Sequence, residues 1–321
     1  MKTISIVTAC FNEQDNVENL CQRIKVVMAG LPEYDYEHIL IDNCSTDDTV
    51  SLIKTIAESD KKVKLIVNAR NFGAIRSGFH GFMQGHGDCV IPMAADLQDP
   101  PELIPELIQK WEQGSFVVLL VKPESIEGWP MSAIRRLYYK FADSISEVPL
   151  IRNATGSGLY DKRAVDILRS IDDPYPYFRG LISEIGFPIE TVEFVQPRRE
   201  QGVTKNNFYT LYDLAMLGIT KHSKVPLRLL TMAGFLLSIF SVLIMLFYLG
   251  MKLIYWDSFS MGTAPVLIGI FFFASVQLFF MGMLGEYIGS IHTHVRKLPL
   301  VVELERVNFT DVEAVNGDSN E

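Results

Sequence analysis

Residues 3–28 read TISIVTACFNEQDNVENLCQRIKVVM, in which a short run rich in β-branched residues is followed by apolar residues at helical spacing. The run predicts a β-strand over residues 3–9, and the spacing predicts an α-helix after it. The same order recurs three times, with strands predicted at residues 38–41, 63–67 and 89–93. The sequence therefore predicts an α/β fold in which helices cover both faces of a mostly parallel sheet.

Polar side chains that follow each predicted strand are the candidate site residues, because ligands of such sheets bind at the carboxyl ends of the strands. They are Asn12 and Glu13, Asp42 and Asn43, Asn68, Arg70 and Asn71, and Asp96, Gln98 and Asp99. No GxGxxG follows the first strand and no GxxxxGK[ST] occurs, which disfavours a dinucleotide-binding fold and a P-loop NTPase. We expect the carboxylates and amides to meet at one edge of the sheet.

The stretch AADLQD at residues 94–99 carries two oxygen-bearing side chains at alternate positions after a buried strand. Alternation places Asp96 and Gln98 on the same side of the chain if it stays extended. Mg²⁺ prefers oxygen ligands and usually binds one or two carboxylates together with substrate phosphates. The stretch predicts a metal and diphosphate site. The alternative is a polar turn in which Asp99 is the N-cap of the helix that begins at the following prolines.

Two long apolar runs follow the globular part of the sequence. The first, residues 229–249, has no charged residue, and the second, residues 264–291, is interrupted by Gln277 and Glu286. At about 1.5 Å per residue, each run is long enough to cross a hydrocarbon core of ~30 Å. The alternative is a buried helical hairpin of a soluble fold, in which runs this uniformly apolar are rare. We predict two transmembrane helices within residues 228–291.

Basic residues lie on the outer flanks of both apolar runs. Lys221, Lys224 and Arg228 precede the first run, and Arg296 and Lys297 follow the second. By the positive-inside rule, both flanks lie in the cytoplasm. The sequence predicts an integral inner (plasma) membrane protein whose globular domain (residues 1–206), C-terminal tail (residues 292–321) and both termini are cytoplasmic.

Residues 207–227 form an amphipathic juxtamembrane segment. Its apolar face consists of Phe208, Leu211, Tyr212, Ala215 and Ile219. This spacing predicts an interfacial helix on the membrane surface, and the alternative is a helix packed against the globular core. The segment, together with the Gly285 and Gly289 pair in the second run, favours self-association as a homo-oligomer.

Composition excludes two other classes of site. The 321 residues include 29 Lys and Arg against 38 Asp and Glu, and a net charge of −9 disfavours a broad basic surface, so no nucleic-acid partner is expected. The four cysteines are scattered without a short pair, so the sequence predicts neither a zinc site nor a disulfide framework.

Five ordered motifs, followed by the paired apolar runs, resemble glycosyltransferase family 2, and more closely its polyprenyl-phosphate glycosyltransferase branch. The motifs are TACFNE at 8–13, IDNCSTDDT at 41–49, RNFG at 70–73, ADLQDPP at 95–101, and Arg199 through Gly202 to Thr204 and Lys205. The resemblance implies a GT-A (Rossmann-like) fold. It also implies an inverting hexosyltransferase that moves one sugar from a nucleotide sugar, UDP-glucose, to polyprenyl (undecaprenyl) phosphate with Mg²⁺ or Mn²⁺.

The resemblance also implies roles for particular residues. The residues that line the nucleotide sugar are Ala9, Phe11, Glu13, Asp42 and Asp96. Asp96 and Gln98 hold the metal. The family places an acidic residue at position 94, where this sequence has Ala94, so one metal ligand is missing.

The acceptor implied by the resemblance, a polyprenyl phosphate, predicts roles for further residues. A phosphate monoester with a second pKa of ~6 is largely deprotonated at neutral pH, so it hardly needs a general base. Catalysis then rests on Asp96 with its metal and on basic side chains that position the acceptor. The candidates for these side chains are Arg136, Arg199 and Lys205. The alternative for each is a solvated surface charge. An Arg fork suits phosphate geometry better than Lys. If a base is needed, Asp161 or Glu184 could serve, but each is more often a surface carboxylate, so neither is predicted to be catalytic.

Two other functions stay open. The first is a transferase with a hydroxyl lipid acceptor, which requires a base because a hydroxyl must lose its proton. The second is a non-catalytic membrane scaffold with a degenerate transferase domain, motivated by Ala94. Metal-dependent hydrolysis of a sugar nucleotide distinguishes an enzyme from a scaffold.

Overall fold

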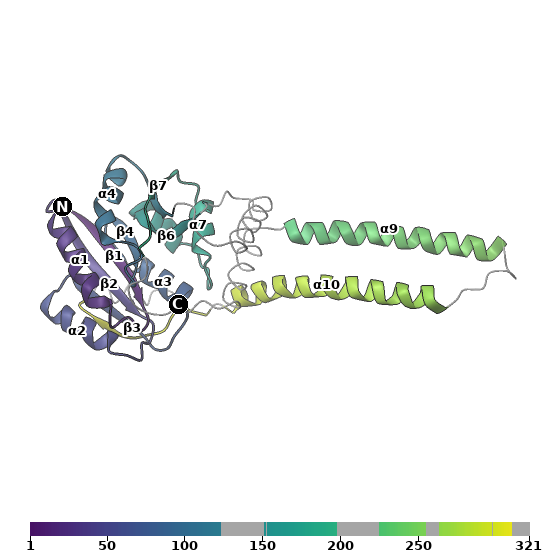
Figure 1. Cartoon of the computed structure of the whole chain (residues 1–321), viewed down its shortest axis with the longest axis horizontal. Helices are drawn as coiled ribbons and strands as arrows, with labels where there is room; N and C mark the ends of the chain where they lie inside the picture. Colours follow the sequence, from purple (N-terminus) through teal and green to yellow (C-terminus); the bar gives the residue numbers. More distant parts are fainter. Residues whose placement is uncertain (123–150, 152, 198–224, 255–262, 297, 310–321) are drawn as a thin grey trace. The chain divides into compact units, whose positions relative to one another are not determined.

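The computed structural model describes residues 1–122, 151, 153–197, 225–254, 263–296 and 298–309 (Figure 1). These residues belong to two compact units. One is a globular unit of strands and helices, and the other contains two long helices. The predicted surface helix in residues 207–227 lies almost entirely outside the described residues.

One mixed sheet forms the centre of the globular unit. Its first four strands are β1 (Lys2–Cys10), β2 (Tyr34–Asp42), β3 (Val63–Asn68) and β4 (Cys89–Ala94). The others are β5 (Val117–Val121), β6 (Ala154–Asp161), β7 (Ile189–Glu193) and β8 (Glu303–Val307). The strand order is β7-β5-β6-β4-β1-β2-β3-β8. β1 pairs in parallel with β2 and β4, and β2 pairs in parallel with β3, whereas β6 and β8 pair antiparallel with their neighbours.

Helices cover both faces of this sheet. The helices are α1 (Val17–Ala29), α2 (Thr49–Ser59), α3 (Ala74–Met83), the 3₁₀ helix η1 (Pro101–Leu103), α4 (Ile104–Glu112), α6 (Lys162–Arg169) and α7 (Phe178–Glu184). Ile4 and Ile6 of β1 pack with buried residues of α1 and α4, whereas Val7 packs with those of α3, α6 and α7. Because successive side chains of a strand point to opposite faces, these two clusters lie on opposite faces of the sheet. The predicted α/β fold is confirmed.

The four predicted strand and helix units are present, with bounds that differ by a few residues. β8 was not anticipated. It comes from the segment predicted as a C-terminal tail, and it pairs antiparallel with β3, from Leu65↔Val307 to Asn68↔Glu303. The chain beyond the second long helix therefore completes one edge of the sheet.

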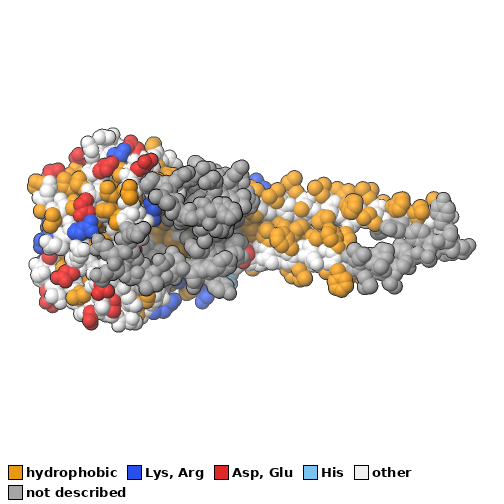
Figure 2. Space-filling model, viewed as in Figure 1, with side chains coloured by type: hydrophobic (Ala, Val, Ile, Leu, Met, Phe, Trp, Pro, Cys, Tyr) orange, Lys and Arg blue, Asp and Glu red, His pale blue; other side chains and the backbone are white. Residues whose placement is uncertain are grey.

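The second unit contains α9 (Val225–Ile254) and α10 (Thr263–Val295), which match the two predicted apolar runs. By length and composition, both are apolar enough to cross a membrane, and none of the residues in their most apolar windows is buried. Figure 2 shows hydrophobic side chains over the visible faces of both helices. A Cβ added to Gly285 or Gly289 would meet nothing within 4 Å among the described residues, so neither glycine packs against α9.

Candidate functional site

The carboxyl ends of three parallel strands bring the predicted residues together. In the register of the sheet, Cys10 lies opposite Asp42 on β2, and Ala9 lies opposite Ala94 on β4. Neighbouring strands are about 4.8 Å apart, so Ala9, Asp42 and the start of the 95–99 turn share one edge. The expectation that the polar residues after these strands converge is met here.

The loops that follow β1 and β2 hold each other by hydrogen bonds. The Asn12 amide donates to Ser45 Oγ at 2.9 Å, while Asn12 Oδ1 accepts from the Thr46 amide at 2.8 Å. The Glu13 amide donates to Thr49 Oγ1 at 2.9 Å. Asn12 has a φ of 55°, a left-handed conformation that Asn tolerates better than most residues. The two loops therefore form one unit that fixes the backbone at Glu13, while Glu13 Oε2 accepts from Asn16 Nδ2 at 2.7 Å.

Asp42 is fully buried at the end of β2. One carboxylate oxygen accepts from the Ser45 amide at 2.8 Å, and the other accepts from Ser45 Oγ. Burial raises the pKa of Asp42, and the hydrogen bonds from Ser45 oppose that rise. Ser45 belongs to the IDNCSTDDT motif, but the sequence pattern alone does not predict that it holds this carboxylate.

Asn43 fixes the loop that follows β3. Its Nδ2 donates to Asn71 Oδ1 at 2.9 Å, and its Oδ1 accepts from the Phe72 amide at 2.9 Å. Asn71 Oδ1 also accepts from the Gly73 amide at 2.8 Å. Arg70 lies over the Phe72 ring, with its Cζ 4.0 Å from the ring centroid. The RNFG motif is thus held by amide side chains on one side and presents an exposed guanidinium on the other.

The turn that follows β4 carries the predicted metal ligands. Asp96 and Gln98 are partly exposed, whereas Ala95, Leu97 and Asp99 are buried. The condition for the predicted alternation, an extended chain, is not met, because Leu97 has a φ of 58° and Asp96 Oδ1 accepts from the Gln98 amide at 3.3 Å. Exposure nevertheless alternates along the turn. A carboxylate and a side-chain carbonyl are oxygen donors that fit a hard divalent cation.

Ala94 leaves this donor set small. Among the described residues, no group of three or more His, Cys, Asp and Glu side chains is arranged to hold a metal ion. Two protein oxygens are nevertheless compatible with a cation such as Mg²⁺, which keeps several waters and takes further ligands from substrate phosphates.

Asp99 does not cap the following helix, so that alternative is wrong. The N-cap of η1 is Pro100, with no side-chain hydrogen bond. Asp99 Oδ2 instead accepts from Ser157 Oγ of β6 at 2.5 Å, while Oδ1 is buried without a hydrogen-bond partner among the described residues. Burial raises the pKa of Asp99. Asp99 therefore ties the 95–99 turn to β6.

The two candidate bases differ in their surroundings. Asp161 lies opposite Cys89 at the start of β4, and thus at the other end of that strand from Asp96. It accepts from Trp111 Nε1 at 2.8 Å and caps α6 through the Arg163 amide. Asp161 thus lies the length of β4 away from the converging strand ends, and its hydrogen bonds give it a structural role, which agrees with the surface-carboxylate alternative over a catalytic base. Glu184 is exposed at the end of α7.

The cationic candidates Arg136, Arg199 and Lys205 lie outside the described residues. Their predicted contact with the acceptor phosphate stays a prediction.

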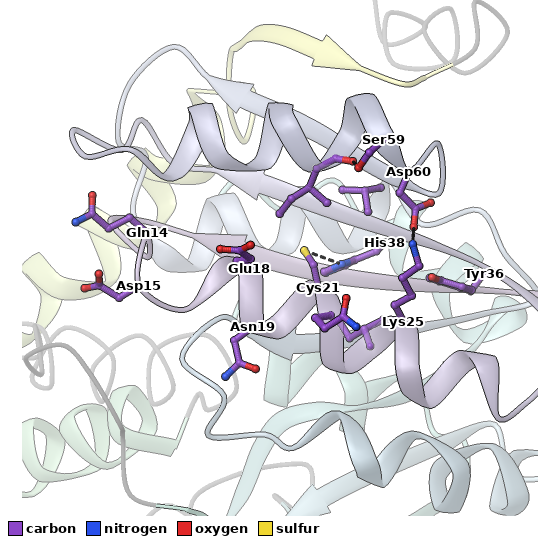
Figure 3. Close-up of a pocket in the computed structure, with 14 residues that line it drawn as sticks. Gln14, Asp15, Glu18, Asn19, Cys21, Lys25, Tyr36, His38, Ser59 and Asp60 are labelled. Carbon is purple, nitrogen blue, oxygen red and sulfur yellow. Dashed lines mark hydrogen bonds and ion pairs between the residues drawn. The ribbon is translucent and has the colours of Figure 1, made fainter.

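A cavity of about 620 Å³ lies between α1 and α2 (Figure 3). None of the predicted site residues lines it. Its innermost polar group, His38, bonds Thr8 Oγ1 at 3.0 Å, and burial lowers the pKa of His38 to about 3. Burial also raises the pKa of Cys21 to about 12. Both groups are therefore neutral at physiological pH, and the charged residues that line the cavity are Asp15, Glu18, Lys25 and Asp60.

A model of the family described as "Glycosyl transferase family 2" matches residues 5–166, which include the converging ends of β1, β2 and β4. The chain belongs to glycosyltransferase family 2. An uncharacterized glycosyltransferase of Synechocystis is 31% identical over 98% of this chain and 99% of its own. A bactoprenol glucosyl transferase of Shigella flexneri is 32% identical over 92% of this chain and 96% of its own.

Among solved structures, the mannosyltransferase PcManGT from Pyrobaculum calidifontis, in complex with GDP-Man and Mn²⁺, is 14% identical. It covers 91% of this chain and 86% of its own, with a TM-score of 0.47. Family 2 membership confirms the family predicted from the motifs. It also confirms the predicted class of enzyme, a glycosyltransferase.

Proposed function

We propose that this family 2 glycosyltransferase moves one glucose from UDP-glucose to undecaprenyl phosphate at the cytoplasmic face of the inner membrane. The observation that carries the proposal is the likeness to bactoprenol glucosyl transferases, which extends over 92% of the chain. A likeness of that length takes in the two long apolar helices as well as the sheet. A lipid acceptor accounts for why a sugar transferase carries such helices.

The nucleotide sugar would bind at the shared edge of β1, β2 and β4. Ala9 and Asp42 end two adjacent strands, and the Phe11 and Glu13 side chains follow on the loop that Ser45 and Thr49 hold. Because both oxygens of Asp42 already accept from Ser45, its main role here is to shape the nucleoside pocket. A further lone pair on each oxygen remains for the base or ribose.

Asp96 and Gln98 would hold Mg²⁺ or Mn²⁺, since both are partly exposed oxygen donors on one turn. When bound, such a cation neutralises negative charge that develops on the departing nucleoside diphosphate. The chain's own part is to fix these donors, and Asp99 does so by joining the turn to Ser157 on β6. Ala94 predicts weak metal affinity in the absence of the nucleotide.

The acceptor phosphate needs orientation rather than deprotonation, because its second pKa is ~6. Asp161 at the opposite end of β4 agrees with a reaction that uses no base from that position. Arg136, Arg199 and Lys205 are proposed to bind this phosphate, with Arg136 and Arg199 aligning its oxygen for attack. Attack from the face opposite the leaving group inverts the anomeric configuration.

The membrane arrangement follows from the same proposal. We infer that α9 and α10 cross the inner membrane, that the globular domain and both termini are cytoplasmic, and that the chain assembles as a homo-oligomer. Basic residues on the outer flanks of both helices support the orientation. A hydroxyl lipid acceptor and a non-catalytic scaffold are the alternatives, and Ala94 is the observation that favours the scaffold.

The test is transfer of radiolabelled glucose from UDP-glucose to undecaprenyl phosphate by the detergent-purified full chain, with Mg²⁺, Mn²⁺ or EDTA. We expect an organic-soluble product that EDTA and Asp96→Ala abolish. Asp35→Ala is the matched control, because Asp35 is an exposed carboxylate that pairs with Lys62 at the opposite end of β2. If folded protein forms no lipid product, the phosphate acceptor is wrong. Metal-dependent hydrolysis of UDP-glucose alone would then indicate another acceptor, and its absence a scaffold.

A further inference from the structure

The chain returns from α10 to the globular unit through residues 298–308, which we call the C-terminal segment. This segment contains β8, the edge strand beside β3. Val301 is buried, and Leu300 packs against the core cluster that contains Phe79 and Phe82 of α3. The segment is thus an integral part of the domain that carries the donor site, although it is distant from the site's motifs in sequence.

Two hydrogen bonds from this segment flank the RNFG motif. The Ala69 amide, one residue before the motif, donates to the Val302 carbonyl at 2.9 Å. On the other side, Arg76 Nη2 donates to the Pro299 carbonyl at 2.5 Å. The loop between Ala69 and Arg76 is therefore held at both ends by the C-terminal segment, while Asn43 holds its middle.

Arg76 joins the C-terminal segment to the exposed face of the motif. Its Cζ lies 5.5 Å from the Phe72 ring centroid, over which Arg70 also lies. Burial lowers the pKa of Arg76, and the nearby charge of Arg70 lowers it further. Within the described part of the chain, no carboxylate forms an ion pair with either arginine. The Pro299 carbonyl is thus the acceptor that holds Arg76 in place.

A second set of contacts anchors the far half of α3. Glu303 Oε1 lies 2.6 Å from His80 Nε2, and Arg306 donates to Glu303 at 2.5 Å and to Gln84 at 2.9 Å. α3 also lies close to the sheet, since a Cβ on Gly81 would meet Ile41 Cγ2 at 2.7 Å. With both ends of α3 held, a shift of the C-terminal segment would move Arg76 and the ring beneath it.

We propose that the C-terminal segment positions the donor site. It fixes Arg76 and, through Arg76, the Phe72 ring and the Arg70 guanidinium. These groups lie beside Asp42 and Asn43 at the end of β2, where the nucleoside diphosphate is proposed to bind. Arg76 and Glu303 are positioning residues that act through Arg70 and Phe72. This inference rests on the proposed function for the identity of the ligand, a nucleoside diphosphate, and adds a determinant of its affinity.

The experiment compares two glutamates on the same strand in the full chain. Glu303→Gln weakens the contacts with His80 and Arg306, whereas Glu305→Gln weakens only the ion pair with Lys54 on α2. We expect Glu303→Gln to raise the Kd for UDP and the KM for UDP-glucose about threefold, because a weaker bond to His80 loosens α3, the helix that carries Arg76. We expect Glu305→Gln to change neither quantity, because Lys54 lies on α2. The kcat at saturating donor should change less than about twofold in both.

We expect substitution of Arg76 to raise the Kd for UDP more than substitution of Glu303 does. We expect Arg76→Gln to raise the Kd for UDP about tenfold and Arg76→Lys, which keeps a cation and a donor, to restore part of that loss. Equal Kd values for Glu303→Gln and Glu305→Gln, or a fall in kcat with KM unchanged, would overturn the inference. Thermal unfolding of each variant shows whether it folds. If an Arg76 variant does not fold, the comparison of the Kd for UDP between Glu303→Gln and Glu305→Gln tests the inference.

The unmodified chain separates this inference from the proposed function. If it binds UDP and forms the lipid product while the variants behave like it, only the positioning role fails. If it binds UDP but forms no lipid product, the acceptor proposal fails, and the Kd comparison still decides the positioning role. If it binds no UDP at all, both proposals fail.

Discussion

Asp42 and Asp96 occupy similar places in the sheet but have different surroundings. Both follow parallel strands at the same edge, yet Asp42 is fully buried with both oxygens accepting from Ser45, whereas Asp96 is partly exposed on a turn. The hydrogen bonds from Ser45 hold the Asp42 carboxylate in place, so this residue maintains the shape of the site. Asp96 lies at a partly exposed position, where a ligand or a cation can reach its carboxylate. We therefore expect substitution of Asp42 to affect mainly stability and substitution of Asp96 to affect mainly ligand binding.

The largest expected effect comes from Asp96→Asn. Removing the charge from a residue proposed to hold a metal should lower glucosyl transfer about 100-fold or more. The free energy of unfolding should change by less than about 0.5 kcal/mol, because the side chain is partly exposed. Transfer assays and thermal unfolding measure the two quantities. A large loss of stability with a proportionate loss of activity would show that Asp96 is structural, like Asp42.

Asp42→Asn should affect stability more directly than it affects activity. An Asn amide nitrogen would face one of the two Ser45 donors, so we expect a loss of about 2 kcal/mol in the free energy of unfolding, with weaker UDP binding as a consequence. Ser45→Ala, which removes one hydroxyl donor, should cost less. Denaturant unfolding and UDP titration give both values. An unchanged stability would indicate that the Ser45 contacts contribute nothing.

Asp161→Asn tests the far end of the same sheet. Asn can still accept from Trp111 Nε1 but loses its charge beside Arg163, so we expect a loss of about 1 kcal/mol in stability. Transfer should stay within about twofold of the unmodified enzyme, since the residue lies opposite Cys89, away from the site. A large loss of kcat in a stable protein would restore Asp161 as a base.

The smallest expected effect is that of Glu303→Gln on the pH dependence of stability. The pKa of Glu303 is lowered, whereas that of Asp42 is raised. Burial tends to raise the pKa of Glu303, but hydrogen bonds and charge from His80 and Arg306 lower it from 4.5 to about 2. A lowered carboxylate pKa contributes stability above pH 4.5 that is lost as the pH falls from 4.5 towards 2. We expect the unfolding temperature of Glu303→Gln to fall less steeply across this window than that of the unmodified chain. Parallel curves would contradict the shift.

The α/β architecture, the two apolar helices and the residues at the strand ends were predictable because each depends on local pattern. Alternation along β1 and the spacing in α1 report which side chains are buried. The strand ends then predict where the site lies, since parallel strands bring their carboxyl ends to one edge. The family followed from motifs at those same positions.

Contacts between distant segments required the tertiary structure. Asp99 carries the sequence signs of a helix cap, yet its partner is Ser157, 58 residues away. The sequence leaves open whether Asp161 is a base or a surface carboxylate, and only the antiparallel pairing of β6 shows that it lies at the start of β4, away from the converging strand ends. β8 is a short, charged edge strand with little periodicity, and Arg76 finds its acceptor 223 residues away at Pro299. Sequence pattern reports burial, which is local, whereas the partner of a buried polar group depends on how the whole chain packs.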